Sequence, residues 1–198
     1  MKKSRKKNKP RLVFFISGRG SNMKAILKKI QEGKLKADPV LVFSDNPQAK
    51  GLEIAKKYGI ETKSFSPKDF TTREEYEVAL RDMVIQAKAD LVVCAGYMRI
   101  LKQPILQAMR GRIVNIHPSL LPAFPGLKAQ KQALDYGVKF SGCTVHFVDE
   151  GVDTGPIIDQ RVVPVKKNDT VESLSKRILK QEHDLYWRSI RDVLKKLP

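Results

Sequence analysis

Short apolar runs alternate with longer amphipathic segments over the first 116 residues, and this alternation limits the possible folds more than any other feature. Leu12–Ile16 and Leu91–Ala95 are uninterrupted apolar runs. Such runs are typical of strands buried on both faces of a parallel sheet. Further strands are predicted at residues 39–43, 62–65 and 112–116. The alternation predicts an α/β fold with a mostly parallel, doubly wound sheet, similar to a Rossmann mononucleotide-binding half.

The segments between these strands carry helix signals. Ser21 and Asn22 are suitable caps for a helix over residues 23–32, which we expect to end near Gly33. A second helix is expected over residues 50–58. Thr72 and Glu75 form a capping-box pattern and predict a third helix, running to about residue 88.

The pattern changes after residue 137. Residues 141–148 and 157–165 predict an antiparallel pair of strands, and residues 171–197 predict a closing helix. No internal repeat or long linker divides the chain, and 198 residues suit one domain. We therefore interpret residues 1–10 as a basic, disordered leader and residues 11–198 as one domain.

The net charge of +17 is partly concentrated at the amino terminus, where residues 1–11 supply seven positive side chains. Such a segment can bind nucleic acid or be a solvated end. The apolar stretch Leu12–Ile16 is too short for a signal peptide, and no run approaches the ~20 residues of a membrane span. Cys94 and Cys143 lack a CxxC pattern, which favours free thiols. We expect a cytoplasmic protein with no membrane association.

A glycine-containing loop, Ser17–Asn22, lies between the first strand and the first helix. Small residues before a helix amino terminus let backbone amides approach an anion. The loop lacks the third glycine of a dinucleotide fingerprint and the Gly-Lys-Ser/Thr ending of a P-loop. A phosphomonoester therefore suits the loop better than NAD or ATP, and a tight turn without ligand is the alternative.

Polar residues at the end of the fifth strand indicate chemistry. Asn115 and His117 are two residues apart and lie on one side of the strand, at its carboxyl end. An asparagine amide can donate to an oxyanion, and a histidine can transfer a proton near neutral pH. Asp153, in a loop of small residues, is a turn former or a partner of His117. Sequence spacing leaves this choice open.

Four motifs together resemble the folate-dependent glycinamide ribonucleotide transformylases of the formyltransferase superfamily. They are Ser17–Asn22, Gly96–Leu101, Asn115–Pro122 and Asp153–Pro156, and the resemblance extends over residues 11–198. It implies transfer of the formyl group of 10-formyltetrahydrofolate, as co-substrate, to the amine of glycinamide ribonucleotide in purine synthesis. The implied reaction requires no metal, and the resemblance leaves the oligomeric state open.

The resemblance also implies roles for individual residues. Asn115, His117 and Asp153 would be catalytic, and His146 would support them. The substrate would contact Gly20, Ser21 and Asn22 through its phosphate and Glu182 through its ribonucleotide part. The pterin would lie beside Met98, Arg99, Ile100 and Leu101, with Arg73 facing the folate glutamate. The sequence departs from the best-known members at Lys128–Gln130, where histidines often occur.

Rival interpretations are weaker. A serine hydrolase would need a Gly-x-Ser-x-Gly elbow, and a zinc site of His117, His146 and Asp153 has no ligand-spacing motif. An RNA-binding module is disfavoured because no aromatic-interleaved basic motif is present, so nucleic acid is an unlikely partner. A hydrolase that releases formate from the same folate remains the enzymatic alternative.

Overall fold

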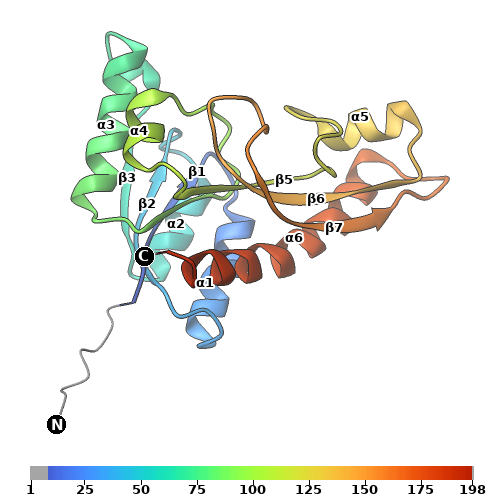
Figure 1. The fold of residues 1–198 in the computed structure, drawn as a ribbon, viewed down its shortest axis with the longest axis horizontal. Helices are drawn as coiled ribbons and strands as arrows, with labels where there is room; N and C mark the ends of the chain where they lie inside the picture. The colour runs from blue at the N-terminus through green and yellow to red at the C-terminus, as the bar shows by residue number, and fades with distance from the viewer. Residues whose placement is uncertain (1–8, 198) are drawn as a thin grey trace.

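A seven-stranded sheet forms the centre of the molecule in the computed structural model, which describes residues 9–197 (Figure 1). The strand order is β3-β2-β1-β4-β5-β6-β7. The pairs among β1 to β5 are all parallel, whereas β6 is antiparallel to β5 and β7 is antiparallel to β6. This confirms the predicted fold class. The strands are β1 (Arg11–Ile16), β2 (Asp38–Ser44), β3 (Glu61–Ser64), β4 (Leu91–Cys94), β5 (Ile113–His117), β6 (Phe140–Phe147) and β7 (Ile157–Pro164).

Helices cover both faces of the sheet (Figure 1). They are α1 (Ser21–Gln31), α2 (Lys50–Lys57), α3 (Arg73–Gln86), α4 (Gln103–Ala108), α5 (Ala129–Tyr136) and α6 (Val171–Leu194), with a 3-10 turn η1 (Pro67–Asp69). Most of the proposed leader, residues 1–8, lies outside the described residues. The carbonyl of Pro10 accepts a hydrogen bond from the backbone N–H of Asp38, 2.8 Å away.

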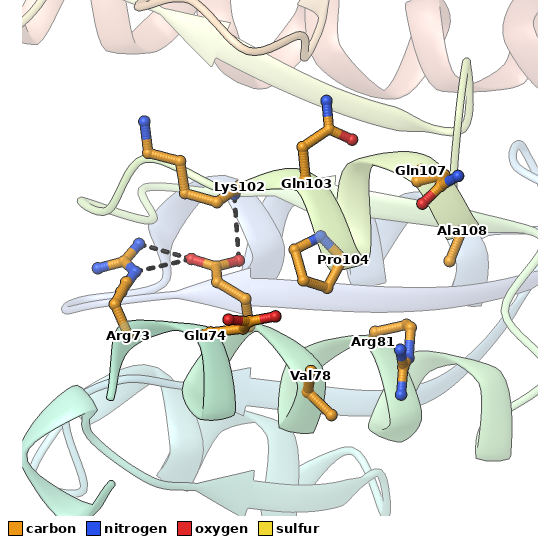
Figure 2. Close-up of a pocket in the computed structure, with 10 residues that line it drawn as sticks. Arg73, Glu74, Val78, Arg81, Lys102, Gln103, Pro104, Gln107 and Ala108 are labelled. Atoms are coloured by element: carbon orange, nitrogen blue, oxygen red, sulfur yellow. Dashed lines mark hydrogen bonds and ion pairs between the residues drawn. The ribbon is translucent and has the colours of Figure 1, made fainter. Parts of the chain in front are cut away.

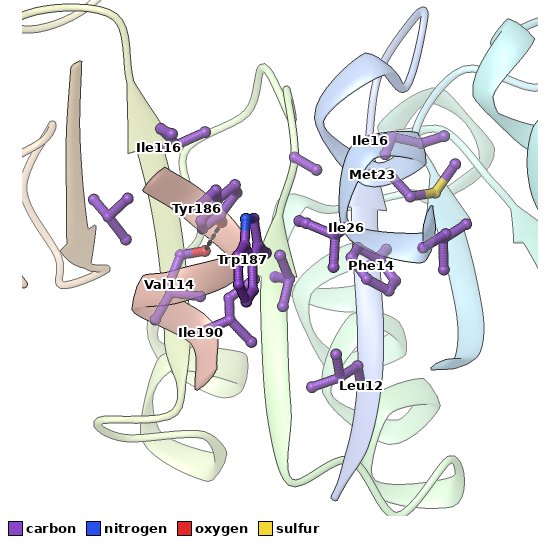
Figure 3. Close-up of a cluster of buried hydrophobic side chains, with 14 of the residues drawn as sticks. Leu12, Phe14, Ile16, Met23, Ile26, Val114, Ile116, Tyr186, Trp187 and Ile190 are labelled. Atoms are coloured by element: carbon purple, nitrogen blue, oxygen red, sulfur yellow. Dashed lines mark hydrogen bonds between the residues drawn. The ribbon is translucent and has the colours of Figure 1, made fainter. Parts of the chain in front are cut away.

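The alternation of side chains along the parallel strands divides the core into two layers. In β1, Leu12, Phe14 and Ile16 pack toward α1, α2 and α6, and Val13 and Phe15 pack toward α3 and α4. All five side chains are fully buried. Figure 3 shows the first layer, where Leu12, Phe14 and Ile16 of β1 lie beside α1. Their burial explains why the strand reads as a continuous apolar run.

The closing helix α6 is attached to the middle of the sheet through Tyr186. Its hydroxyl lies 2.9 Å from the carbonyl oxygen of Cys94 and 3.0 Å from that of Val114, in the neighbouring strands β4 and β5 (Figure 3). The ring is fully buried, so it contributes apolar contact and satisfies its own polar group. This contact fixes α6, and therefore Glu182, relative to β5.

Most element boundaries agree with the sequence prediction, and the differences have local causes. Thr72 and Glu75 form the predicted capping box of α3. The prediction that Ser21 and Asn22 cap α1 was wrong. The helix starts at Ser21, its N-cap is Gly20 with a φ of 68°, and no side chain caps it. The helices α4 and α5 and the turn η1, of three to eight residues each, were not predicted.

The antiparallel part of the sheet sets the register of the polar residues. Asn115 in β5 pairs with His146 in β6, and His117 pairs with Thr144. Because these pairs are two residues apart, their side chains share one face of the sheet. Within the described residues 9–197, no helix is long and apolar enough to cross a membrane.

Candidate functional site

Four polar side chains meet near the end of β5. His117 closes β5, and Asp153 lies in the loop between β6 and β7. The Nδ1 atom of His117 is 3.2 Å from Oδ2 of Asp153. The Nε2 atom of His146 is 3.5 Å from Oδ1 of the same carboxylate and 3.3 Å from Nδ2 of Asn115. The structure therefore brings together the residues that the sequence could not place relative to one another.

His117 is held by oxygen atoms at both ring nitrogens. Besides the contact of Nδ1 with Asp153, its Nε2 lies 2.8 Å from the carbonyl oxygen of Phe124. A carbonyl and a carboxylate both accept hydrogen bonds, so the imidazole satisfies both only when each nitrogen carries a proton. The side chain is 6% exposed, and water has little access to it.

Asn115 and His146 form the second half of the cluster. The Nδ1 atom of His146 lies 2.8 Å from the carbonyl of Phe147, which requires an N–H at Nδ1. In the neutral tautomer Nε2 then accepts from the Asn115 amide; in the charged form it donates to Asp153. An asparagine amide has two N–H groups, so Asn115 keeps one for another acceptor when it donates one to His146.

Asp153 is the shared acceptor of the cluster. Burial alone would raise its pKa, but the contact with His146, the hydrogen bond from the Gly126 backbone and the charge of His117 hold the pKa below its ordinary value. The Gly126 N–H donates to Oδ2 over 2.8 Å. Asp153 itself has a φ of 57°, a left-handed conformation that aspartate tolerates better than most residues. The carboxylate is thus ionised and fixed in position.

The glycine loop lies against the start of α2. Gly20 has a φ of 68°, and a Cβ there would lie 2.8 Å from the Cα of Gly51. The Gly51 N–H donates to the carbonyl of Gly18 over 3.0 Å. Two glycines are therefore required for loop and helix to approach this closely. The amino terminus of α1 at Ser21 opens from this loop, as an anion-binding terminus does.

Glu182 reaches the same region from α6. Its Oε2 accepts a hydrogen bond from Nδ2 of Asn22 over 2.7 Å, and both residues are buried. Burial raises the pKa of Glu182, which the bond from Asn22 offsets only in part. The Oδ1 atom of Asn22 is buried and has no hydrogen-bond partner among the described residues. This unpaired acceptor and the buried carboxyl are suited to donors on a polar ligand.

The segment expected to border a pterin is anchored to the ends of neighbouring strands. The Met98 N–H donates to the Ser17 hydroxyl over 2.9 Å, and that hydroxyl donates to Oδ1 of Asp45 over 2.6 Å. Arg99 binds the other oxygen of Asp45 at 2.6 Å. The order of the sheet reverses between β1 and β4, the position at which open α/β sheets bind ligands. The side chains of Met98 and Ile100 are exposed there, while Leu101 is buried.

Arg73 lies at the edge of this region and is shared between two partners. It binds the Glu77 carboxylate through Nη2 at 2.6 Å and the carbonyl of Ile100 at 2.5 Å. The other oxygen of Glu77 accepts from the Lys102 backbone over 3.1 Å (Figure 2). Arg73 also lines an open groove of about 730 Å³ between α3 and α4. Glu77 thus links α3 to the segment that ends at Leu101.

The sequence analysis missed several of the residues that fix this site. Asp45 follows β2 at its carboxyl end, so the rule that identified Asn115 and His117 applies to it as well. Glu77 gave no signal, because a glutamate on a helix is usually solvated. Over residues 9–197, no group of three or more His, Cys, Asp or Glu side chains is arranged to hold a metal ion.

Comparisons with known proteins show the family of the chain. A formyl transferase family model matches residues 10–190. The chain belongs to the formyl transferase family. A phosphoribosylglycinamide formyltransferase from Bacillus subtilis is 43% identical over 184 residues, covering 93% of this chain and 94% of that protein. A trifunctional purine biosynthetic protein adenosine-3 from Drosophila melanogaster is 48% identical over 182 residues, and the match covers 91% of this chain but only 14% of that protein.

Solved structures of formyl transferases agree with the fold. A glycinamide ribonucleotide transformylase 1 from Symbiobacterium toebii has a TM-score of 0.92 at 48% identity, covering 94% of this chain and 88% of that one. A phosphoribosylglycinamide formyltransferase from Bacillus halodurans has a TM-score of 0.91 at 43% identity, covering 95% and 97%. Because these matches cover nearly the whole chain, the likeness includes both the parallel and the antiparallel parts of the sheet.

Proposed function

We infer that this formyl transferase moves the formyl group of 10-formyltetrahydrofolate to the amine of glycinamide ribonucleotide, a step of de novo purine biosynthesis. The observation that carries the inference is the meeting of Asn115, His117 and Asp153 at the carboxyl edge of the sheet. The names of the full-length relatives support the choice of substrate. We further propose that the protein works on these small molecules in the cytoplasm without a metal, and that nucleic acid is no partner.

The ligands occupy two sides of the catalytic residues in this proposal. The phosphate of the ribonucleotide binds Gly20, Ser21 and Asn22 at the start of α1, and Glu182 accepts from its ribose hydroxyls. The pterin lies along Met98–Leu101, whose exposed side chains provide apolar contact. Its glutamate extends toward Arg73, whose side chain is 43% exposed.

Attack of the amine nitrogen on the formyl carbon forms a C–N bond and moves an electron pair to the formyl oxygen. Asn115 donates its second amide N–H to this oxyanion. His117, charged and held by Asp153 and Phe124, stabilises it electrostatically. The nitrogen then loses a proton, the oxyanion returns its electron pair to the carbon, and the bond between this carbon and N10 of the folate breaks as N10 gains a proton. Asp153, His117 or an ordered water carries these protons, which typically contributes about a hundred- to ten-thousandfold in rate.

The test combines the purified protein with both substrates and follows the formylated product, beside a reaction without acceptor amine. Transfer that requires the acceptor and is lost in His117→Ala supports the proposal. Release of formate without acceptor would instead indicate the hydrolase. If Asn115→Ala and His117→Ala both kept rates within a fewfold of the unmodified protein, the assignment of these residues would be wrong.

A further inference from the structure

The side chain of Gln160, in the edge strand β7, binds the loop that follows His117. Its Nε2 donates to the carbonyl oxygen of Leu121 over 3.0 Å and to the hydroxyl of Thr144 over 2.9 Å. Thr144 lies opposite Gln160 in β6, so the two side chains share one face of the sheet. Both N–H groups of the Gln160 amide are therefore used in holding this loop.

Thr144 also forms hydrogen bonds to this loop. Its hydroxyl is fully buried, donates to the carbonyl of Ser119 over 2.7 Å and accepts from the Leu121 N–H over 3.0 Å. Since a hydroxyl has one proton and two acceptor sites, the bond from Gln160 fills its last position. Removing Gln160 would leave the buried Thr144 oxygen and the Leu121 carbonyl each short of a donor.

This loop determines the surroundings of His117. Three residues after Leu121, the carbonyl of Phe124 accepts from Nε2 of His117 over 2.8 Å. Phe124 has a φ of 55°, a left-handed conformation that is costly for an aromatic residue and persists only where the surroundings enforce it. The Gly126 N–H then donates to Asp153. The position of residues 119–121 therefore controls both oxygen atoms that orient the imidazole.

We propose that Gln160 is a positioning residue for formyl transfer, which acts through Thr144 and residues 119–121 to hold the Phe124 carbonyl against His117. The proposal rests on the proposed function for its kinetic consequence. Its structural consequence, the orientation of the His117 ring, is independent of turnover. Misplacement of a reacting group by about 1 Å can cost a hundredfold in rate, so loss of the Gln160 amide affects kcat more than KM.

The first variant is Gln160→Met, which keeps the length of the side chain and removes both donors. Val162→Met is the matched control, because Val162 is exposed and lies two residues further along the same face of β7. We expect kcat to fall about ten- to a hundredfold in Gln160→Met. KM should stay close to that of the control, whereas the thermal unfolding midpoint should fall by a few degrees, because two acceptors lose their donor. The Nε2–H signal of His117 in NMR spectra should exchange faster with water. A kcat within twofold of the control, or an unchanged His117 signal, would overturn the proposal.

A second variant, Gln160→Glu, makes the test independent of the first. The introduced carboxylate cannot donate, but a proton restores one of the two bonds, and a free glutamate has a pKa of about 4.3. Beside the Leu121 carbonyl this pKa should rise, so the rate relative to the unmodified protein should recover as the pH approaches 5. The charged neighbours Asp159 and Arg161 are present in all variants and therefore do not cause a difference between them.

The rate of Gln160→Met relative to the unmodified protein should not depend on pH, because methionine has no proton to gain. A flat ratio for Gln160→Glu would count against the proposal as well. An unmodified protein without formyl transfer would refute the proposed function, whereas the NMR comparison would still decide whether Gln160 orients His117.

Discussion

Asn115 and His146 face each other across the antiparallel strands β5 and β6, with 3.3 Å between Nδ2 and Nε2. The pairing turns the amide of Asn115 toward the cluster and engages one of its two N–H groups. His146 is in turn fixed by the Phe147 carbonyl and is almost fully buried. In the proposed mechanism Asn115 is therefore the donor to the substrate, and His146 is the neighbour that holds its amide in place.

This separation predicts different effects for the two residues. Asn115→Ala removes the donor to the oxyanion, and loss of one such donor typically lowers kcat by about a hundred- to a thousandfold. His146→Ala leaves that donor present but less well held, so its effect on kcat should be smaller. Steady-state kinetics with both substrates saturating measures kcat directly. A larger loss in His146→Ala than in Asn115→Ala would reverse these roles.

Asp153→Asn tests the shared carboxylate. The variant replaces the acceptor of the His117 Nδ1–H and should lower kcat by about a hundred- to ten-thousandfold. It should also change the pH dependence of stability. Because the pKa of Asp153 is lowered by folding, its ionised form stabilises the protein above the unfolded pKa near 3.8, and this stability is lost as the pH falls through the folded pKa.

Urea unfolding of both proteins between about pH 2.5 and 6 measures this difference. The free energy of unfolding should decline more steeply below the unfolded pKa in the unmodified protein than in Asp153→Asn. Parallel curves would mean that Asp153 has the same pKa in the folded and unfolded protein, in conflict with its contacts to His146, Gly126 and His117.

Much of the parallel half of the fold was predictable because strands such as β1 and β4 are buried on both faces. Phe14 and Phe15 pack into opposite core layers, so the run Leu12–Ile16 needs no polar residue. The start of α3 was also predictable from local sequence, because its capping box joins Thr72 and Glu75, which are only three residues apart. Such features depend on neighbours in the sequence and can be derived from it.

The site was only partly predictable because it depends on contacts between distant segments. Asn115 and His117 were found from their position at a strand end. The link from His117 to Asp153 depends on the register of β6 and on the left-handed turn at Asp153, which no spacing encodes. Gln160 had no signal at all, because its role follows from the path of the loop that contains Leu121.

Gly20→Ala tests the close approach of the glycine loop to α2. The left-handed conformation alone costs about 1–2 kcal/mol for a residue with a Cβ. Gly33→Ala is the control, since Gly33 has a similar φ of 70° and no atom within 4 Å of the added carbon. At Gly20 that carbon would lie 2.8 Å from the Cα of Gly51. Gly20→Ala should therefore lower the free energy of unfolding more than Gly33→Ala and weaken ribonucleotide binding, as measured by urea unfolding and calorimetry.

Glu182→Gln should increase the stability of the protein and weaken its binding of the ribonucleotide. Burial raises the pKa of Glu182, so the folded protein binds a proton that the unfolded chain has already released. Stability therefore falls as the pH rises from the ordinary value of 4.5 to the folded pKa. A glutamine still accepts from Asn22 without this penalty. The variant should have a higher free energy of unfolding than the unmodified protein at pH 7 and a higher KM for the ribonucleotide, with kcat less affected. Unfolding curves at pH 5 and 7 test the first part, and an equal loss of stability in both proteins over this interval would show that Glu182 is not the group responsible.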